Sequence, residues 1–213
     1  MFNKISEFFS QNKVARQKQS LLQPQYAHLF DTPPTDEWVS LDLEMTGLNP
    51  KTDHILSLGA VKIAKTAHGV EIDTGNALSL ICRPPVMPSR DSIIIHGLRP
   101  SDVENGISYE AMLPQLLDFI GNRPVVGFCV DMDMAFINAI TKPWLGVNLP
   151  NAMLDVSLLE QQHRQQANRN PDNVVKRKHL NELIDEFAIP RLPTHDSLND
   201  AIMVAMVFAH LNY

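Results

Sequence analysis

The alternation of apolar and polar residues predicts three strands between residues 37 and 82. The strands lie at 37–43, 54–63 and 76–82, and the turn-forming run NPKTD separates the first two. A fourth apolar strand is predicted in PVVGF, at residues 124–128. Three early strands and one later strand among helices indicate a single mixed sheet.

Helical spacing of apolar residues predicts a helix from Tyr109 to Ile120 and four later helices. The four lie near residues 133–141, 156–166, 179–188 and 196–211. Proline clusters at 84–88 and around Pro100 predict a long irregular connection before the first of these helices. The order of elements predicts an α/β fold in which helices flank a mixed central sheet.

Residues 1–30 are predicted to be an N-terminal helical extension, and residues 31–213 the main domain. Ile5, Phe8 and Phe9 recur on one side of a helix at 3–22, and two prolines in DTPPTDE separate it from the strands. The extension could bind a protein partner or complete a homodimer. No leader-like or membrane-spanning apolar run is recognised, so we expect a cytoplasmic protein with no membrane contact.

The formal net charge of −6 argues against a broad surface for duplex nucleic acid. It is compatible with an enzyme that holds a few nucleotides, because carboxylates that bind metal ions add to the negative total. Cys82 and Cys129 are far apart and form no zinc motif. The carboxylates are therefore the candidates for catalytic chemistry.

Asp42 and Glu44 lie two residues apart in the first strand, so both side chains point to one face of the sheet. Taken alone, such a pair is more often part of a solvated face. Thr46 and Gly47 end the strand directly afterwards, which places both carboxylates near a strand end, where ligands often bind in sheets covered by helices.

Two further elements carry carboxylates near the start of a helix. Asp133 follows the strand PVVGF and precedes the apolar part of its helix, so that either Asp131 or Asp133 could be a simple N-cap. His195 and Asp200 lie at the start of the last helix, where His195 alone could be a capping or surface histidine and Asp200 a solvent-facing residue.

Together, these elements resemble the DEDDh exonucleases, the superfamily of the DNA polymerase III epsilon subunit, ribonuclease T and oligoribonuclease. The resemblance extends over residues 37–211: HILSLGAVKI is similar to the second strand, IIIHGLRPSDV to the IHG hinge, and LNELIDEFAIP to the helix before the last motif. The tyrosine type of the family would have Tyr at position 196, which is Asp196, so the histidine type is indicated. The resemblance implies a ribonuclease H-like fold.

The resemblance also implies a metal-dependent 3′-5′ exonuclease that uses two divalent ions, Mg²⁺ or Mn²⁺, about 4 Å apart. The implied metal ligands are Asp42, Glu44, Asp133 and Asp200. His195 would be the general base that accepts a proton from the attacking water. Together these five residues form the implied catalytic set.

Substrate contacts are implied for Met45, Thr46, His96 and Phe128. Met45 could equally belong to the core. The chain departs from the family after Gly127, where it has Phe128 and Cys129 and relatives often have His-Asn. A basic run could guide a single strand through its phosphates or simply be solvated; it comprises Arg164, Arg169, Lys176, Arg177 and Lys178.

The resemblance leaves the nucleic acid open, and we favour single-stranded DNA 3′ ends over RNA. The DLEMTGL motif resembles the corresponding motif of oligoribonuclease, whereas the IHG hinge and HDSLNDA resemble those of the proofreading enzymes more closely. A non-catalytic nucleic-acid-binding subunit is disfavoured because all five catalytic positions are filled. An HD-type phosphohydrolase, suggested by His195 and Asp196, is disfavoured by the early strands.

Overall fold

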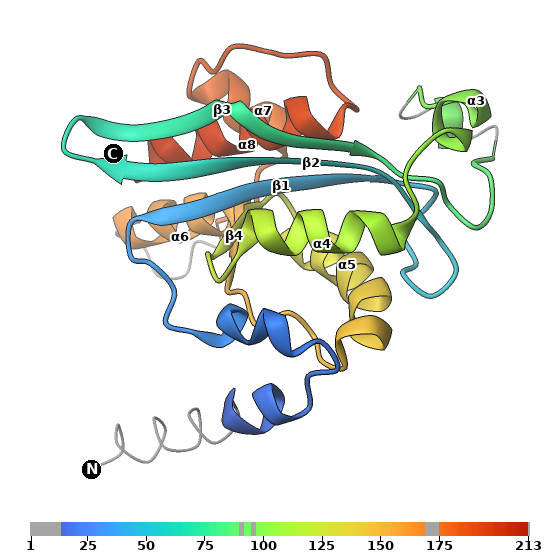
Figure 1. Ribbon diagram of the computed structural model, residues 1–213. Helices are drawn as coiled ribbons and strands as arrows, with labels where there is room; N and C mark the ends of the chain where they lie inside the picture. The colour runs from blue at the N-terminus through green and yellow to red at the C-terminus, as the bar shows by residue number, and fades with distance from the viewer. Residues whose placement is uncertain (1–13, 90–91, 95–96, 169–174, 213) are drawn as a thin grey trace.

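The computed structural model describes residues 14–89, 92–94, 97–168 and 175–212 (Figure 1). In chain order its elements are η1 (Pro24–Phe30), β1 (Glu37–Met45), β2 (Ile55–Thr66), β3 (Gly69–Ile81), α3 (Pro100–Glu104), α4 (Tyr109–Ile120), β4 (Val125–Gly127), α5 (Val130–Leu145), β5 (Met153–Asp155), α6 (Val156–Ala167), α7 (Leu180–Glu186) and α8 (Ser197–Leu211).

The strands form one mixed sheet in the order β3-β2-β1-β4-β5. β1 pairs antiparallel with β2 and parallel with β4, while β3 and β5 form the two edges. β1 is therefore the central strand. Asp42 and Glu44, near its end, are surrounded by other elements. This arrangement confirms the predicted mixed sheet flanked by helices.

Helices cover both faces of the sheet: α4 and α5 lie on one face, and α7 and α8 on the other (Figure 1). Leu41 of β1 belongs to the core on the α4 and α5 side, and Val61 of β2 to the core beneath α8. The apolar run at 201–211 is thus a buried terminal helix, as predicted. Within the described residues, no helix combines the length and the apolar character needed to cross a membrane.

Gly59 of β2 allows the start of α8 to lie directly on the sheet. A Cβ atom at this position would be 2.2 Å from the backbone nitrogen of Leu198, which is well inside van der Waals contact. Gly59 pairs with Asp42 in the β1–β2 ladder. The missing side chain therefore brings the first turn of α8 next to Asp42.

Two serine hydrogen bonds fasten the same helix to the sheet. The Ser40 hydroxyl donates to the Ala201 carbonyl at 2.7 Å, and the Ser57 and Ser197 hydroxyls lie 3.0 Å apart. Ser40 and Ser197 are buried, so each bond satisfies polar atoms that have left water. The position of α8 along β1 is thereby set.

The element predictions agree best where an apolar stripe is long. The helix from Tyr109 to Ile120 is confirmed as α4. The third strand was predicted to start at 76, which is wrong: β3 starts at Gly69, and its first half is a polar edge with no continuous apolar run. β5 and α3 were not predicted, because three and five residues are too few to show a period.

The described part of the N-terminal segment packs against the main core. Residues 14–19 are helical, and η1 follows. The Tyr26 ring of η1 lies 5.5 Å from that of Trp144 in α5, between ring centroids. Ile5, Phe8 and Phe9 lie outside the described residues, so the helix at 3–22 and the division at residue 30 stay predictions.

Candidate active site

Three of the predicted carboxylates meet where β1 ends. Oxygen atoms of Asp42, Glu44 and Asp200 all lie within 4.8 Å of one another. Asp42 and Glu44 share the face of β1 that α8 covers, and a register shift between Glu44 and Met45 marks the end of regular pairing. A bulge of this kind re-aims side chains near a strand end.

Asp200 lies in the first turn of α8 and is held partly buried over the sheet. One of its carboxylate oxygens accepts a hydrogen bond from the His195 backbone N–H, at 3.1 Å. Burial raises the pKa of Asp200, and this hydrogen bond and the nearby His195 partly oppose the shift. Asp200 therefore faces the carboxylate pair rather than the solvent.

Asp133 approaches Asp42 from α5, on the other side of β1. It is 4% exposed, and after burial its charge is the largest cause that raises the pKa of Asp42. Neither Asp131 nor Asp133 is the N-cap of α5; that position is Cys129, whose φ of 56° is left-handed. The N-cap interpretation is therefore wrong, and Asp133 is free to turn toward β1.

The four carboxyl groups have raised pKa values because they are buried close to like charges. Burial first, then Asp200, raises the pKa of Glu44 to about 7. Burial and then Asp131 raise the pKa of Asp133, against a hydrogen bond with the Leu43 backbone. Such a site is poorly stable when fully ionised.

A divalent cation fits this set of donors. Every donor is a carboxylate oxygen, the ligand that hard ions such as Mg²⁺ and Mn²⁺ prefer. A bound cation would also compensate the excess negative charge of the carboxylate cluster among the described side chains.

His195 lies directly before α8, with an exposed side chain and a left-handed φ of 60°. The N-cap of α8 is the next residue, Asp196, so His195 is not a capping residue. His195 also lowers the pKa of Asp200 electrostatically, which places it beside the carboxylates. It thus combines access to solvent with proximity to the cluster.

The residues expected to touch substrate are in varied surroundings. The Thr46 hydroxyl accepts a hydrogen bond from the His54 backbone N–H at 2.9 Å, which closes the turn after β1. Met45 packs on the core beneath α4 and α5, and Phe128 on the core beneath α8, both partly buried. His96 lies outside the described residues. Substrate contact by these four residues stays a prediction.

Arg164, Arg177 and Lys178 of the basic run form ion pairs. Arg164 and Lys178 bind Glu160, Lys178 also binds Glu186, and Arg177 donates to Asp155 at 2.8 Å. These contacts fasten the segment at 175–178 to α6. Arg169 lies outside the described residues.

Asp155, at the end of β5, was not predicted as a site residue. It caps α6, and its other oxygen accepts the Cys129 backbone N–H at 2.9 Å, next to the start of α5. An Asp followed by Ser157 and a helical stretch is a cap signal that could have been recognised. Asp155 therefore helps to place α5, and with it Asp133.

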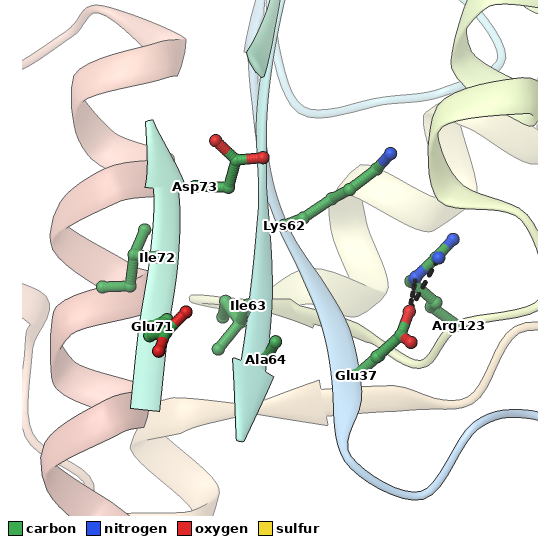
Figure 2. A pocket seen from close by; sticks show the side chains of 8 residues that line it. All are labelled: Glu37, Lys62, Ile63, Ala64, Glu71, Ile72, Asp73 and Arg123. Carbon is green, nitrogen blue, oxygen red and sulfur yellow. Dashed lines mark hydrogen bonds and ion pairs between the residues drawn. The ribbon is translucent and has the colours of Figure 1, made fainter. Parts of the chain in front are cut away.

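A hollow of about 580 Å³ lies elsewhere, near the start of β1 (Figure 2). Glu37 and Arg123 form a 2.7 Å ion pair there, and Lys62, Glu71 and Asp73 add charges of both signs. Glu37 and Asp42 are five residues apart in the strand, or roughly 17 Å. This hollow is thus separate from the carboxylate cluster.

Comparison with known proteins matches most of this chain to one family. A family model for RNase T, described as exonuclease, matches residues 39–208. The DNA polymerase III PolC-type of Thermotoga petrophila is 30% identical over 171 residues, which cover 80% of this chain and 11% of that protein. The DNA polymerase III subunit epsilon of Aquifex aeolicus is 27% identical over 171 residues, 80% of this chain and 78% of that one. The chain therefore spans about a tenth of the length of the PolC-type relatives.

Solved structures with the same fold include two nucleases. Exonuclease I of E. coli, in complex with a dT13 oligonucleotide, has a TM-score of 0.64 at 16% identity, over 84% of this chain and 41% of that one. The nuclease domain of 3′hExo, described as a DEDDh family member bound to rAMP, has a TM-score of 0.64 at 16% identity, over 85% and 94% of the two chains. At these identities the likeness is one of fold.

Proposed function

This chain belongs to the RNase T family of exonucleases, and we propose that it releases nucleoside monophosphates from the 3′ ends of single-stranded nucleic acid. The observation that carries the proposal is the meeting of Asp42, Glu44 and Asp200 within 4.8 Å. These residues match the family's motifs in order and spacing. Their uncompensated charge is what a metal-dependent hydrolase requires and what a structural surface avoids.

Hydrolysis of a phosphodiester requires water to attack a phosphorus atom that already carries negative charge. Two divalent ions, Mg²⁺ or Mn²⁺, would supply Lewis-acid stabilisation and a more acidic water. Asp42 is close to Asp133 as well as to Glu44 and Asp200, so we propose that it would help to hold both ions. Glu44 and Asp200 would hold the ion on the water side, and Asp133 would support the other.

His195 would take the proton from the attacking water on an imidazole nitrogen. Imidazole is the side chain used most often as a general base, and the exposure of His195 leaves room for the exchange of that proton with solvent. The hydrogen bond from its backbone to Asp200 links the base to the metal ligand.

DNA is the substrate that we favour. The relatives at 27–30% identity are named as DNA polymerase III chains. An RNA 3′ exonuclease is the second candidate, supported by the DLEMTGL motif and by the fold shared with 3′hExo, which is described as bound to rAMP. A role for the N-terminal segment in binding a protein partner or completing a homodimer and a cytoplasmic location remain predictions.

The test uses 5′-labelled single-stranded DNA and RNA of one sequence, with Mg²⁺ or Mn²⁺ and with EDTA. We expect stepwise shortening from the 3′ end that requires metal and is faster on DNA. His195→Ala should lower the rate roughly 10²- to 10⁴-fold. His163→Ala, at an exposed histidine on α6, is the control and should retain full activity.

Full activity of His195→Ala would remove the assigned base. Binding of the oligonucleotide without any shortening would identify a non-catalytic binding subunit instead. Faster shortening of RNA would select the second candidate.

A further inference from the structure

The backbone at His195 is held in a conformation that L-residues rarely adopt. Its φ of 60° lies in the left-handed region, which costs a non-glycine residue roughly 1 kcal/mol or more. The residues around it must therefore maintain this conformation.

Hydrogen bonds from the first turn of α8 fold the chain around His195. The Asp196 carboxylate accepts the backbone N–H groups of Leu198 and Asn199, at 3.1 and 3.0 Å. The Asn199 side-chain amide donates to the Pro193 carbonyl at 3.0 Å. The Asn199 bond thus joins the helix to the segment that precedes His195 and closes the loop at 193–199.

Asn199 is separated from the carboxylate cluster although it is next to Asp200 in sequence. Adjacent helical residues point about 100° apart. Asn199 turns its amide toward Pro193, while Asp200 faces Asp42 and Glu44. Removing the Asn199 amide therefore leaves the carboxylates in place.

We propose that Asn199 is a positioning residue for His195. Its side-chain amide closes the loop at 193–199 and holds His195 where it can take a proton from the attacking water. The inference rests on the proposed function. It goes beyond that function because Asn199 touches neither metal nor substrate in this account.

The same segment has two other attachments, which makes the test informative. The Leu192 backbone N–H lies 3.5 Å from the Met203 sulfur, just before the loop, and the His195 backbone N–H donates to Asp200 at 3.1 Å. The segment should therefore stay docked when Asn199 is truncated, and the stretch between these two attachments should loosen.

A double-mutant cycle tests the proposal. Asn199→Ala should lower kcat roughly 10- to 100-fold, the effect of a small displacement of a catalytic group, with KM and the Mg²⁺-induced rise in Tm unchanged. In the His195→Ala background the same substitution should lower kcat less than about 2-fold, because its effect passes through His195. Asn122→Ala is the matched control: Asn122 donates a similar bond to the Thr32 carbonyl, at 2.9 Å, far along the chain.

Hydrogen exchange supplies a readout that needs no substrate. Backbone amides at 194–197 should exchange faster in Asn199→Ala, by about tenfold, and remain as in the wild type in Asn122→Ala. Unchanged exchange at these amides would overturn the inference about Asn199, whether or not the wild type is active. An inactive wild type would instead overturn the proposed function. Equal losses of kcat in both backgrounds, or loss of the Mg²⁺-induced rise in Tm, would also overturn the inference.

Discussion

Among the described residues, the buried carboxylates Glu160 and Glu44 differ in what surrounds them. Glu160 on α6 is 3% exposed and is paired with Arg164 and Lys178. Burial raises its pKa, but the hydrogen bonds from these two cations outweigh burial, and the pKa is lowered. Glu44 on β1 is 9% exposed and faces other acids, so its pKa is raised to about 7.

The comparison separates a structural role from a functional one. The carboxylate on α6 is neutralised by cations of the same chain and fastens a loop. The cluster of Asp42, Glu44, Asp133 and Asp200 faces mainly its own negative charge. Folding retains such a cluster when a cation from outside completes it, which is why we assign the chemistry to this group.

The largest expected effect is on activity, through Asp42→Asn. Losing a ligand shared by both ions should remove several kcal/mol of stabilisation of the transition state, or at least about a thousandfold in rate. Without metal, the same variant should be more stable than the wild type, because a repelling charge is gone. Rates of shortening of labelled single-stranded DNA measure the activity, and urea unfolding in EDTA measures the stability. An Asp42→Asn variant as active as the wild type would contradict the functional role of the carboxylate cluster.

The second effect concerns how α8 reaches the cluster. Gly59→Ala should destabilise the fold by about 3 kcal/mol, because the new methyl group meets the backbone of Ser197 and Leu198 within 2.4 Å. Activity should fall with it, since Asp200 moves away from Asp42. Gly75→Ala on β3 is the control, with 3.6 Å to its nearest neighbour, and should change stability little.

The third effect is the reverse of the first. Glu160→Gln should destabilise the protein by about 2 kcal/mol, because it leaves two cations with a weaker acceptor. The rate of nucleotide release should remain that of the wild type at temperatures well below Tm. A lost rate in the still-folded variant would show that the ion-paired group also takes part in the reaction.

The smallest effect is on pH dependence. A raised pKa means that the folded state binds the proton more tightly, so Glu44 contributes stability below pH 4.5 that is lost as pH rises through about 7. In EDTA, Glu44→Gln should reduce this loss of stability by roughly 1 to 2 kcal/mol.

The stability that Glu160 contributes depends on pH in the opposite direction, because the pKa of Glu160 is lowered. Its contribution is present above its ordinary pKa and is lost as pH falls. Urea unfolding between pH 3 and 8 compares the two variants: Glu44→Gln should flatten the loss toward high pH and Glu160→Gln the loss toward low pH. Equal slopes in the two variants would contradict this difference.

Much of this could be predicted from the sequence because the relevant signals are local. The alternation of β1 puts Asp42 and Glu44 on one face, and the long stripe of α4 gives both of its ends. The resemblance then predicted that Asp200 joins them, and the structure brings these three together. The family and the fold are confirmed.

What could not be predicted depends on contacts between distant segments. The role of Gly59 appears only when α8 is laid across β2, 139 residues later in the chain at Leu198. The sequence of the basic run is typical of exposed charge. The structure places Asp155 and Glu160 beside it, and they form ion pairs with it. The polar first half of β3 shows no long alternation of apolar and polar residues. It is a strand because it pairs with β2, and this pairing is not visible in the local sequence.

The most direct test of the central claim is the binding of Mn²⁺ measured by calorimetry, with no substrate present. The account predicts that the wild type and Glu160→Gln bind Mn²⁺ alike and gain Tm on binding, whereas Asp42→Asn loses most of both. Equal Mn²⁺ binding by the wild type and Asp42→Asn would contradict the assignment of the metal site to the end of β1.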